Sequence, residues 1–315
     1  MSHQTARTDP YQLVTDTILA HLDHGVVPWR CPWNRSTGRP RNFHSGHEYR
    51  GVNVLLLGLL QFASPWWMTF RQVQERGGMV RKGEHGAFVM KWGRHDKTVK
   101  NGDGTEEQKK TFFLKSYKVF NATQIEGIEF PAVEKGPQLD PTQRIACAEQ
   151  IIREMPQPPI IREGRGTQAC YRRNSDTIEM PAFASFATPE EFYLTLYHEA
   201  IHATGAESRL ARKGIQESDG FGGKVYSQEE LVAEMGAAFL GMEVGIVRDQ
   251  HEQSAAYLKG WLDVLKEPDH RRWIVLAANQ AGRAADFILG RTPDDIAPTP
   301  AGEEPAHAEP LPAAA

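Results

Sequence analysis

A metal-binding pattern lies in the second half of the chain, where residues 198–202 have the sequence H-E-x-x-H. In a helix, side chains four residues apart lie on the same face, so His198 and His202 would project together. Two imidazoles placed in this way can ligate one Zn²⁺, and Glu199 beside them is suited to accept the proton of a water bound there. The pattern therefore predicts metal-assisted hydrolysis with Glu199 as the catalytic base.

The residues around this pattern predict the helix that it needs. Thr188 has the side chain of an N-cap, Pro189 suits the first helical position, and Glu190 and Glu191 place acids in the first turn. Gly205 offers a C-terminal stop three residues beyond the second histidine. We therefore expect one amphipathic helix of about four turns with both histidines in its last half.

A third metal ligand is expected from residues 227–240, because a catalytic zinc usually takes three protein ligands and keeps one position open. Ser227 followed by Glu230 has the spacing of a capping box and predicts a second helix. Glu230 and Glu234 are one turn apart, so either carboxylate is a candidate ligand. We favour Glu230 as the ligand and Glu234 as the residue that orients a histidine N–H. Tyr226 is a candidate donor to the oxyanion.

Two ordinary roles compete with this assignment of the carboxylates. Glu230 would then serve only as the acid of the capping box, and Glu234 would be a solvated charge on the helix surface.

Residues 177–180 form an expected strand that could pair with an extended substrate.

The composition is that of a globular protein with room for two domains. The chain has 315 residues, 40% of them hydrophobic and 24% charged, and no run of 18 apolar residues. We expect no membrane span and, because the first residues lack an apolar signal core, a cytoplasmic location. Three scattered cysteines fit neither a disulfide framework nor a zinc ribbon.

The charge is distributed unevenly along the chain. Residues 1–130 carry 18 Lys and Arg against 12 Asp and Glu, whereas residues 131–315 carry 18 against 28. Five of the seven tryptophans fall in the first 92 residues, interleaved with basic residues. Aromatic faces that stack on bases, beside cations that contact phosphates, are typical of single-stranded DNA binding. The candidate DNA-binding residues are Trp29, Arg30, Trp33, Arg35, Arg50, Asn53, Trp67, Arg71, Arg81, Lys82, Lys115 and Tyr117.

Tryptophans are more often core residues than stacking platforms, and we expect about half of these to be buried. The chain has no helix-turn-helix, zinc finger or RRM motif, so sequence-specific recognition of duplex DNA is not supported.

The pattern of elements predicts an α+β fold. Residues 8–130 would form an α+β domain, in which strands at 87–92 and 111–121 flank a polar hairpin loop at 93–110. Residues 131–141 are rich in proline and predict a linker. Residues 142–290, with helices expected near 142–154, 253 and 271–288, would form the domain with the metal site. Residues 291–315, rich in Pro, Ala and acids, predict a disordered tail.

Several motifs, in the same order, resemble the family of ArdC-type antirestriction proteins. In the first half these are residues 28–33, 49–53, 67–70, 81–84 and 117–124, and in the second half residues 176–181, 198–205, 209–210 and 229–234. The resemblance implies an N-terminal domain that binds single-stranded DNA and a C-terminal zincin-like metallopeptidase domain. It also implies a role on conjugative plasmids or similar mobile elements, where the protein protects incoming DNA from host restriction.

Two functional hypotheses follow. In the first, Zn²⁺ on His198, His202 and Glu230 supports peptidase activity on an unknown protein substrate. In the second, the chain coats single-stranded DNA and the zinc site is structural or vestigial, without proteolysis. A nuclease is less favoured, because no further Asp/Glu cluster suggests a two-metal phosphodiesterase site. The first half also resembles the N-terminal domain of certain plasmid primases, but the chain has no room for a primase domain.

Overall fold

The fold was analysed in a computed structural model of the chain. It describes residues 9–30, 39–100, 106–132, 141–164, 166–216, 224–246 and 255–291. Most of the predicted linker, and the predicted tail from residue 292 onward, lie outside the described residues. The fold is mixed α+β, as predicted. None of the described helices is long and apolar enough to cross a membrane.

The first half is built on a four-stranded sheet in the order β1-β2-β5-β4. Strand β1 pairs parallel with β2, and the other neighbours are antiparallel. Its elements are β1 (Arg41–Asn42), α2 (Val52–Gly58), β2 (Trp66–Thr69), α3 (Phe70–Glu75), β3 (Met79–Val80), β4 (Ala87–Lys100), β5 (Glu106–Asn121), η2 (Ala122–Gln124) and β6 (Ile125–Glu126). The short strands β3 and β6 form a second, two-stranded sheet.

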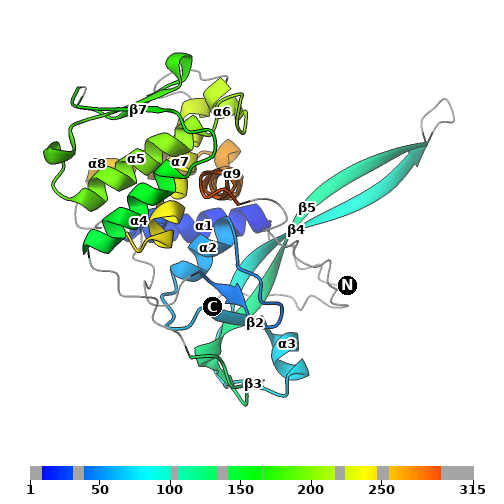
Figure 1. Cartoon of the computed structure of the whole chain (residues 1–315). Helices are drawn as coiled ribbons and strands as arrows, with labels where there is room; N and C mark the ends of the chain where they lie inside the picture. The colour runs from blue at the N-terminus through cyan, green and yellow to red at the C-terminus, as the bar shows by residue number, and fades with distance from the viewer. Residues whose placement is uncertain are drawn as a thin grey trace.

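Strands β4 and β5 form a long antiparallel hairpin that projects from the body of the protein (Figure 1). The prediction of a loop at residues 93–110 was wrong, because the ladder continues to the pair Lys100 and Glu106. Apart from Val99, residues 93–110 are polar or glycine, so this part of the hairpin lacks the alternation of apolar and polar residues by which strands are predicted.

The second half combines helices with a three-stranded sheet in the order β7-β9-β8. Its elements are α4 (Pro141–Arg153), β7 (Ile160–Glu163), β8 (Cys170–Arg172), η3 (Arg173–Ser175), β9 (Thr177–Met180), η4 (Phe183–Ser185), α5 (Pro189–Ala203), α6 (Lys213–Gln216), α7 (Lys224–Glu243), α8 (Ala255–Leu265), η5 (Pro268–His270) and α9 (Trp273–Ile288). Strand β9 is paired on both sides, parallel with β7 and antiparallel with β8. The expectation that residues 177–180 accept a substrate strand was therefore wrong, because their backbone groups are already used.

The beginning of the chain packs into the second half. Helix α1 (Pro10–Asp23) contacts α8 and α9, and the short η1 (Pro28–Arg30) contacts α7. The fully buried Ile18 shares one hydrophobic cluster with Leu265 and Ile274. The first described residues thus help to complete the core that supports the metal site.

A candidate metal centre between two helices

Helix α5, which carries both histidines, begins as predicted. The Thr188 hydroxyl accepts a hydrogen bond from the backbone N–H of Glu191 at 3.2 Å, and Pro189 occupies the first turn. The helix ends at Ala203, so His198 and His202 lie in its last two turns. The cap and the first turn therefore fix where the helix starts, and its period places both imidazoles on one face.

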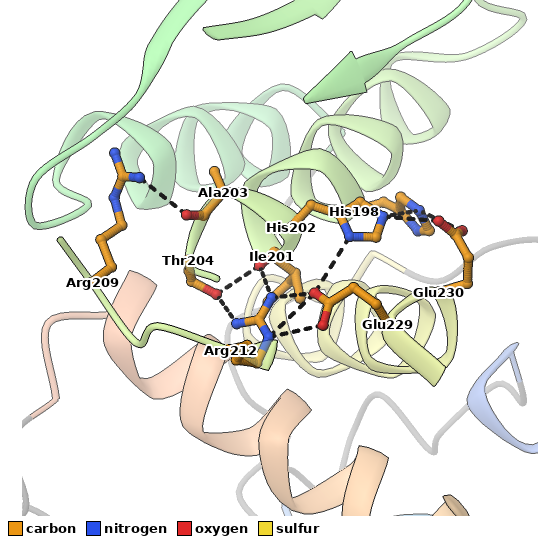
Figure 2. A network of polar contacts seen from close by, with 9 residues as sticks. All are labelled: His198, Ile201, His202, Ala203, Thr204, Arg209, Arg212, Glu229 and Glu230. Carbon is orange, nitrogen blue, oxygen red and sulfur yellow. Dashed lines mark hydrogen bonds and ion pairs between the residues drawn. The ribbon is translucent and has the colours of Figure 1, made fainter. Parts of the chain in front are cut away.

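Three side chains from two helices converge on one point (Figure 2). The Nε2 atoms of His198 and His202 lie 3.1 Å apart. The two carboxylate oxygens of Glu230, from α7, lie 3.4 Å from His198 Nε2 and 3.3 Å from His202 Nε2. Ligand atoms on one tetrahedral zinc ion are about 3.3 Å apart, because the metal–nitrogen bond is about 2 Å long. The donor set and its spacing therefore fit a single metal ion.

Helix α7 begins earlier than the capping box predicted. It runs from Lys224, so Ser227 lies inside the helix and is not its N-cap. The prediction of a capping box was wrong, and the Glu230 carboxylate is turned toward the histidines instead. Tyr226 falls in the first turn of α7, but its side chain lies outside the described part of the structure.

The carboxylate beside His202 Nδ1 is not the expected one. Oε1 of Glu229 lies 3.5 Å from this nitrogen, whereas Glu234 forms an ion pair at 3.3 Å with Arg30. Position 229 is not on the helix face shared by 230 and 234, so the one-turn spacing gave no signal for it. Glu229 was missed for this reason.

The carboxylates of Glu229 and Glu230 change the protonation of His202. Burial alone would lower the pKa of His202, but Glu229 and Glu230 outweigh burial and raise it to about 10. Burial also opposes the charge on Glu230, yet hydrogen bonds to His198 and His202 hold its pKa well below the usual value. In the metal-free protein His202 is therefore a cation at neutral pH, paired with anionic glutamates.

Metal binding should consequently release a proton even in mildly alkaline solution. A histidine with the ordinary pKa of about 6.5 is neutral at pH ~8, but His202, with its pKa raised to about 10, is still protonated there. The apparent metal affinity should rise about tenfold per pH unit until that pKa is reached. Calorimetry in two buffers of different ionisation enthalpy, at pH ~8, should count about one proton released per metal ion from this residue. Release of none would contradict the raised pKa.

Glu199 is buried on α5 beside the ligands, with 8% of its surface exposed. Helix α5 contacts strand β8, an edge strand of the three-stranded sheet. Burial raises the pKa of the Cys170 thiol on β8; the charge of Arg172 opposes this increase, and the charges of Glu179 and Glu199 add to it. The helix that carries Glu199 therefore lies against this edge strand.

The candidate DNA-binding residues fall into distinct environments. Trp29 and Trp67 are 1% and 2% exposed. Their assignment as stacking residues was wrong, since a covered ring presents no face to a base. The side chain of Asn53 accepts from the backbone N–H of Met90 at 2.6 Å and donates to its carbonyl at 2.8 Å, which is a structural role. Trp33 and Arg35 lie outside the described residues.

Part of the basic character of the first half is matched by the acidic second half. Among the described residues, three arginines of the first half form ion pairs with carboxylates of the second half. Arg30 also lies 4.1 Å from the centre of the Tyr257 ring. The pairs are Arg30–Glu234 at 3.3 Å, Arg39–Glu243 at 2.6 Å and Arg50–Asp286 at 2.8 Å. The uneven charge along the sequence therefore reflects contacts within the chain as well as any external anion.

The remaining candidates are at the surface. Arg71 and Arg81 are exposed and form local ion pairs with Glu75 and Glu84, and Lys82 is exposed beside them. Lys115 is exposed on β5, and Tyr117 is half-buried on the same face of that strand.

Sequence reasoning did not select Lys91 of β4, which is the direct partner of Lys115 across the ladder. Trp92, the next residue, pairs with Leu114 and points to the opposite face, with 39% of its surface exposed. Paired residues in an antiparallel ladder point to the same face, so Lys91 and Lys115 lie side by side. The register of a hairpin cannot be read from composition, and this pair was missed for that reason.

The paired histidines, the glutamate of the neighbouring helix and the adjoining sheet define a zincin-like metallopeptidase domain. Residues 146–280 match the family described as a zincin-like metallopeptidase, and residues 8–120 match the N-terminal domain of the anti-restriction factor ArdC.

The solved structures of one such factor agree with these matches. The metal-free crystal structure of the antirestriction protein ArdC from plasmid R388 is 38% identical, with a TM-score of 0.70 over 89% of this chain and 96% of that one. Its Mn(II)-bound structure is 36% identical, with a TM-score of 0.67 over 92% and 98% of the two chains. The chain belongs to the ArdC family of antirestriction proteins.

Two further relatives place the chain in a wider context. The uncharacterised protein y4eC of Sinorhizobium fredii is 33% identical over 298 residues, which are 91% of this chain and 94% of that protein. The DNA primase TraC of Escherichia coli is 32% identical over 301 residues. That match covers 89% of this chain but only 27% of the primase.

Proposed function

We propose that this protein protects the incoming DNA of a conjugative plasmid or similar mobile element from host restriction. In this proposal the first half binds single-stranded DNA and the second half is a zinc-dependent peptidase acting on a protein substrate. The observation that carries the peptidase is the convergence of His198, His202 and Glu230 with the buried Glu199 beside them. The family and the plasmid origin of the related ArdC support the biological role.

The residues of the site have separate roles in peptide hydrolysis. His198, His202 and Glu230 would hold Zn²⁺, which supplies a Lewis acid that polarises the peptide carbonyl. Glu199 accepts the proton of the attacking water and returns it to the leaving amine. Its low exposure keeps bulk water away from the carboxylate, so the proton passes between Glu199 and the reacting groups.

Strand β8 is the candidate docking edge for the substrate. It lies at the end of the order β7-β9-β8, and within the described part of the chain its outer side pairs with no other strand. An extended peptide can add to such an edge through main-chain hydrogen bonds. This mode suits a segment of unfolded or loosely folded protein, and it places the peptide beside α5, the helix that carries Glu199.

The proposed DNA-binding surface is the face of the β4–β5 hairpin that carries Lys91, Phe113, Lys115 and Tyr117. Lys91 and Lys115 are direct cross-strand partners, so their side chains lie on the same face, where one phosphate backbone could contact both. The ammonium of Lys115 lies 4.9 Å from the centre of the Phe113 ring. Cations beside partly exposed aromatic rings are the two features that single-strand binding requires.

Replacing Lys91 and Lys115 together by alanine should weaken single-strand binding and its salt dependence. Each lost phosphate contact lowers the slope of log K against log salt by about 0.7, so the double variant should lose about 1.4. Lys118→Ala is the matched control, because Lys118 is exposed on the same strand but points to the opposite face. Equal losses in the control and the double variant, measured by a salt-dependent anisotropy titration, would contradict this surface.

A further inference from the structure

The two adjacent acidic residues in the second turn of α7 have different surroundings. Glu230 is turned toward the histidine Nε2 atoms, while Glu229 is only 3% exposed and is turned into the protein (Figure 2). Its Oε1 lies 3.5 Å from His202 Nδ1, a buried nitrogen that has no hydrogen-bond partner among the described residues. The imidazole of His202 therefore has a glutamate at each of its two nitrogens.

Arg212 holds Glu229 in this position. Its Nε donates to both carboxylate oxygens at 3.2 Å, and its Nη2 donates to Oε1. Arg212 is itself buried, with 7% of its surface exposed. A guanidinium that binds a carboxylate through two nitrogens fixes both the position and the plane of the carboxylate. Glu229 cannot turn away without leaving a buried cation unpaired.

The same guanidinium also reaches the end of α5. Its Nη1 donates to the Thr204 hydroxyl, and its Nη2 donates to the carbonyl of Ile201 at 2.6 Å. These groups belong to the last turn and the C-cap of the helix that carries the histidines. Arg212 therefore joins the end of α5 to the second turn of α7, the two helices that supply the metal ligands (Figure 2).

We propose that Glu229 and Arg212 are positioning residues of the metal centre. Glu229 is the acceptor nearest to His202 Nδ1, at 3.5 Å, and a hydrogen bond between them would fix the tautomer that leaves the Nε2 lone pair free to bind a metal. Arg212 fixes Glu229 and the spacing of the two helices. This inference rests on the proposed metal site at His198, His202 and Glu230. Loss of a carboxylate in this role typically weakens metal affinity about 10- to 100-fold.

Two variants test the proposal on the full chain. Glu229→Gln removes the charge, and Gly214→Ala moves the carboxylate without changing any charge, because the added Cβ would lie 2.5 Å from Glu229 Oε2. Both should bind Co²⁺ and Zn²⁺ about 10- to 100-fold more weakly in a competition titration with a chromophoric chelator. The visible absorption spectrum of the Co²⁺ form should also change, because the ring of His202 is no longer held.

Arg209→Ala is the matched control. Arg209 also donates to the end of α5, at the Ala203 carbonyl 3.0 Å away, but its ion pair is with Asp176 (Figure 2). It should lower stability while leaving the Co²⁺ spectrum and metal affinity unchanged. Wild-type affinity and spectrum in both test variants, or the same loss in Arg209→Ala, would overturn the proposal. If the wild-type chain bound no metal at all, the metal site itself would be wrong and this inference would fall with it.

Discussion

Replacing Glu199 by glutamine should leave the metal bound and lower the rate of peptide cleavage at least about 100-fold. Glutamine has nearly the same shape, so the ligands on the same helix stay in place, but an amide cannot accept the proton of the attacking water. Cleavage should be measured on an unfolded test protein, with metal content determined on the same sample. Glu190→Gln removes one charge in the first turn of α5, far from the histidines, and should have no effect.

The same variant separates the two proposed activities. If Glu199→Gln cleaves as fast as the wild type, the role of this residue as the base is refuted. If it loses cleavage but still protects DNA from a restriction enzyme, protection comes from the DNA-binding surface alone. The metal site would then serve a separate purpose or a structural one.

Replacing Trp29 by alanine should destabilise the protein by about 3–5 kcal/mol, the cost typical of emptying a large buried aromatic site. The Trp29 ring packs edge-on against Trp261 at 5.4 Å, and its N–H donates to the Tyr257 hydroxyl at 3.3 Å. Denaturant unfolding, followed by far-UV circular dichroism, gives the change in the free energy of unfolding. Single-strand affinity, measured where the variant is still folded, should remain close to that of the wild type.

Trp92→Ala is the control for this substitution, because this ring is partly exposed and makes an edge contact with Tyr11 at 6.2 Å. It should cost much less stability than Trp29→Ala. A Trp29 variant that is as stable as the wild type but binds DNA poorly would show that the ring stacks on bases after all.

The metal helix was predictable because its determinants are local. Thr188, Pro189 and the spacing of the two histidines lie within one stretch, and they specify the cap, the start and the face of α5. Glu230 was also selected from its position on the next helix. Its convergence with the histidines then followed from the packing of α7 on α5, which no local pattern contains.

The supporting contacts were not predictable for the same reason. From the sequence alone Glu229 resembles a surface acid, but in the structure it forms an ion pair with Arg212. Trp29 resembles a stacking residue, but its ring packs against Trp261. Residues 93–110, the outer part of the β4–β5 hairpin, were predicted as a loop because their sequence does not alternate apolar and polar residues. Contacts between residues distant in the sequence leave no local pattern, and neither does a strand whose sequence does not alternate apolar and polar residues.

The central claim is that His198, His202 and Glu230 bind one metal ion, and it can be tested directly by comparing two glutamates on one helix. A metal titration of the wild type should be run beside Glu230→Gln and Glu234→Gln. We expect binding of one ion per chain, a large loss of affinity in Glu230→Gln, and affinity near that of the wild type in Glu234→Gln, whose carboxylate pairs with Arg30. Tight binding in Glu230→Gln together with its loss in Glu234→Gln would contradict the assigned metal centre.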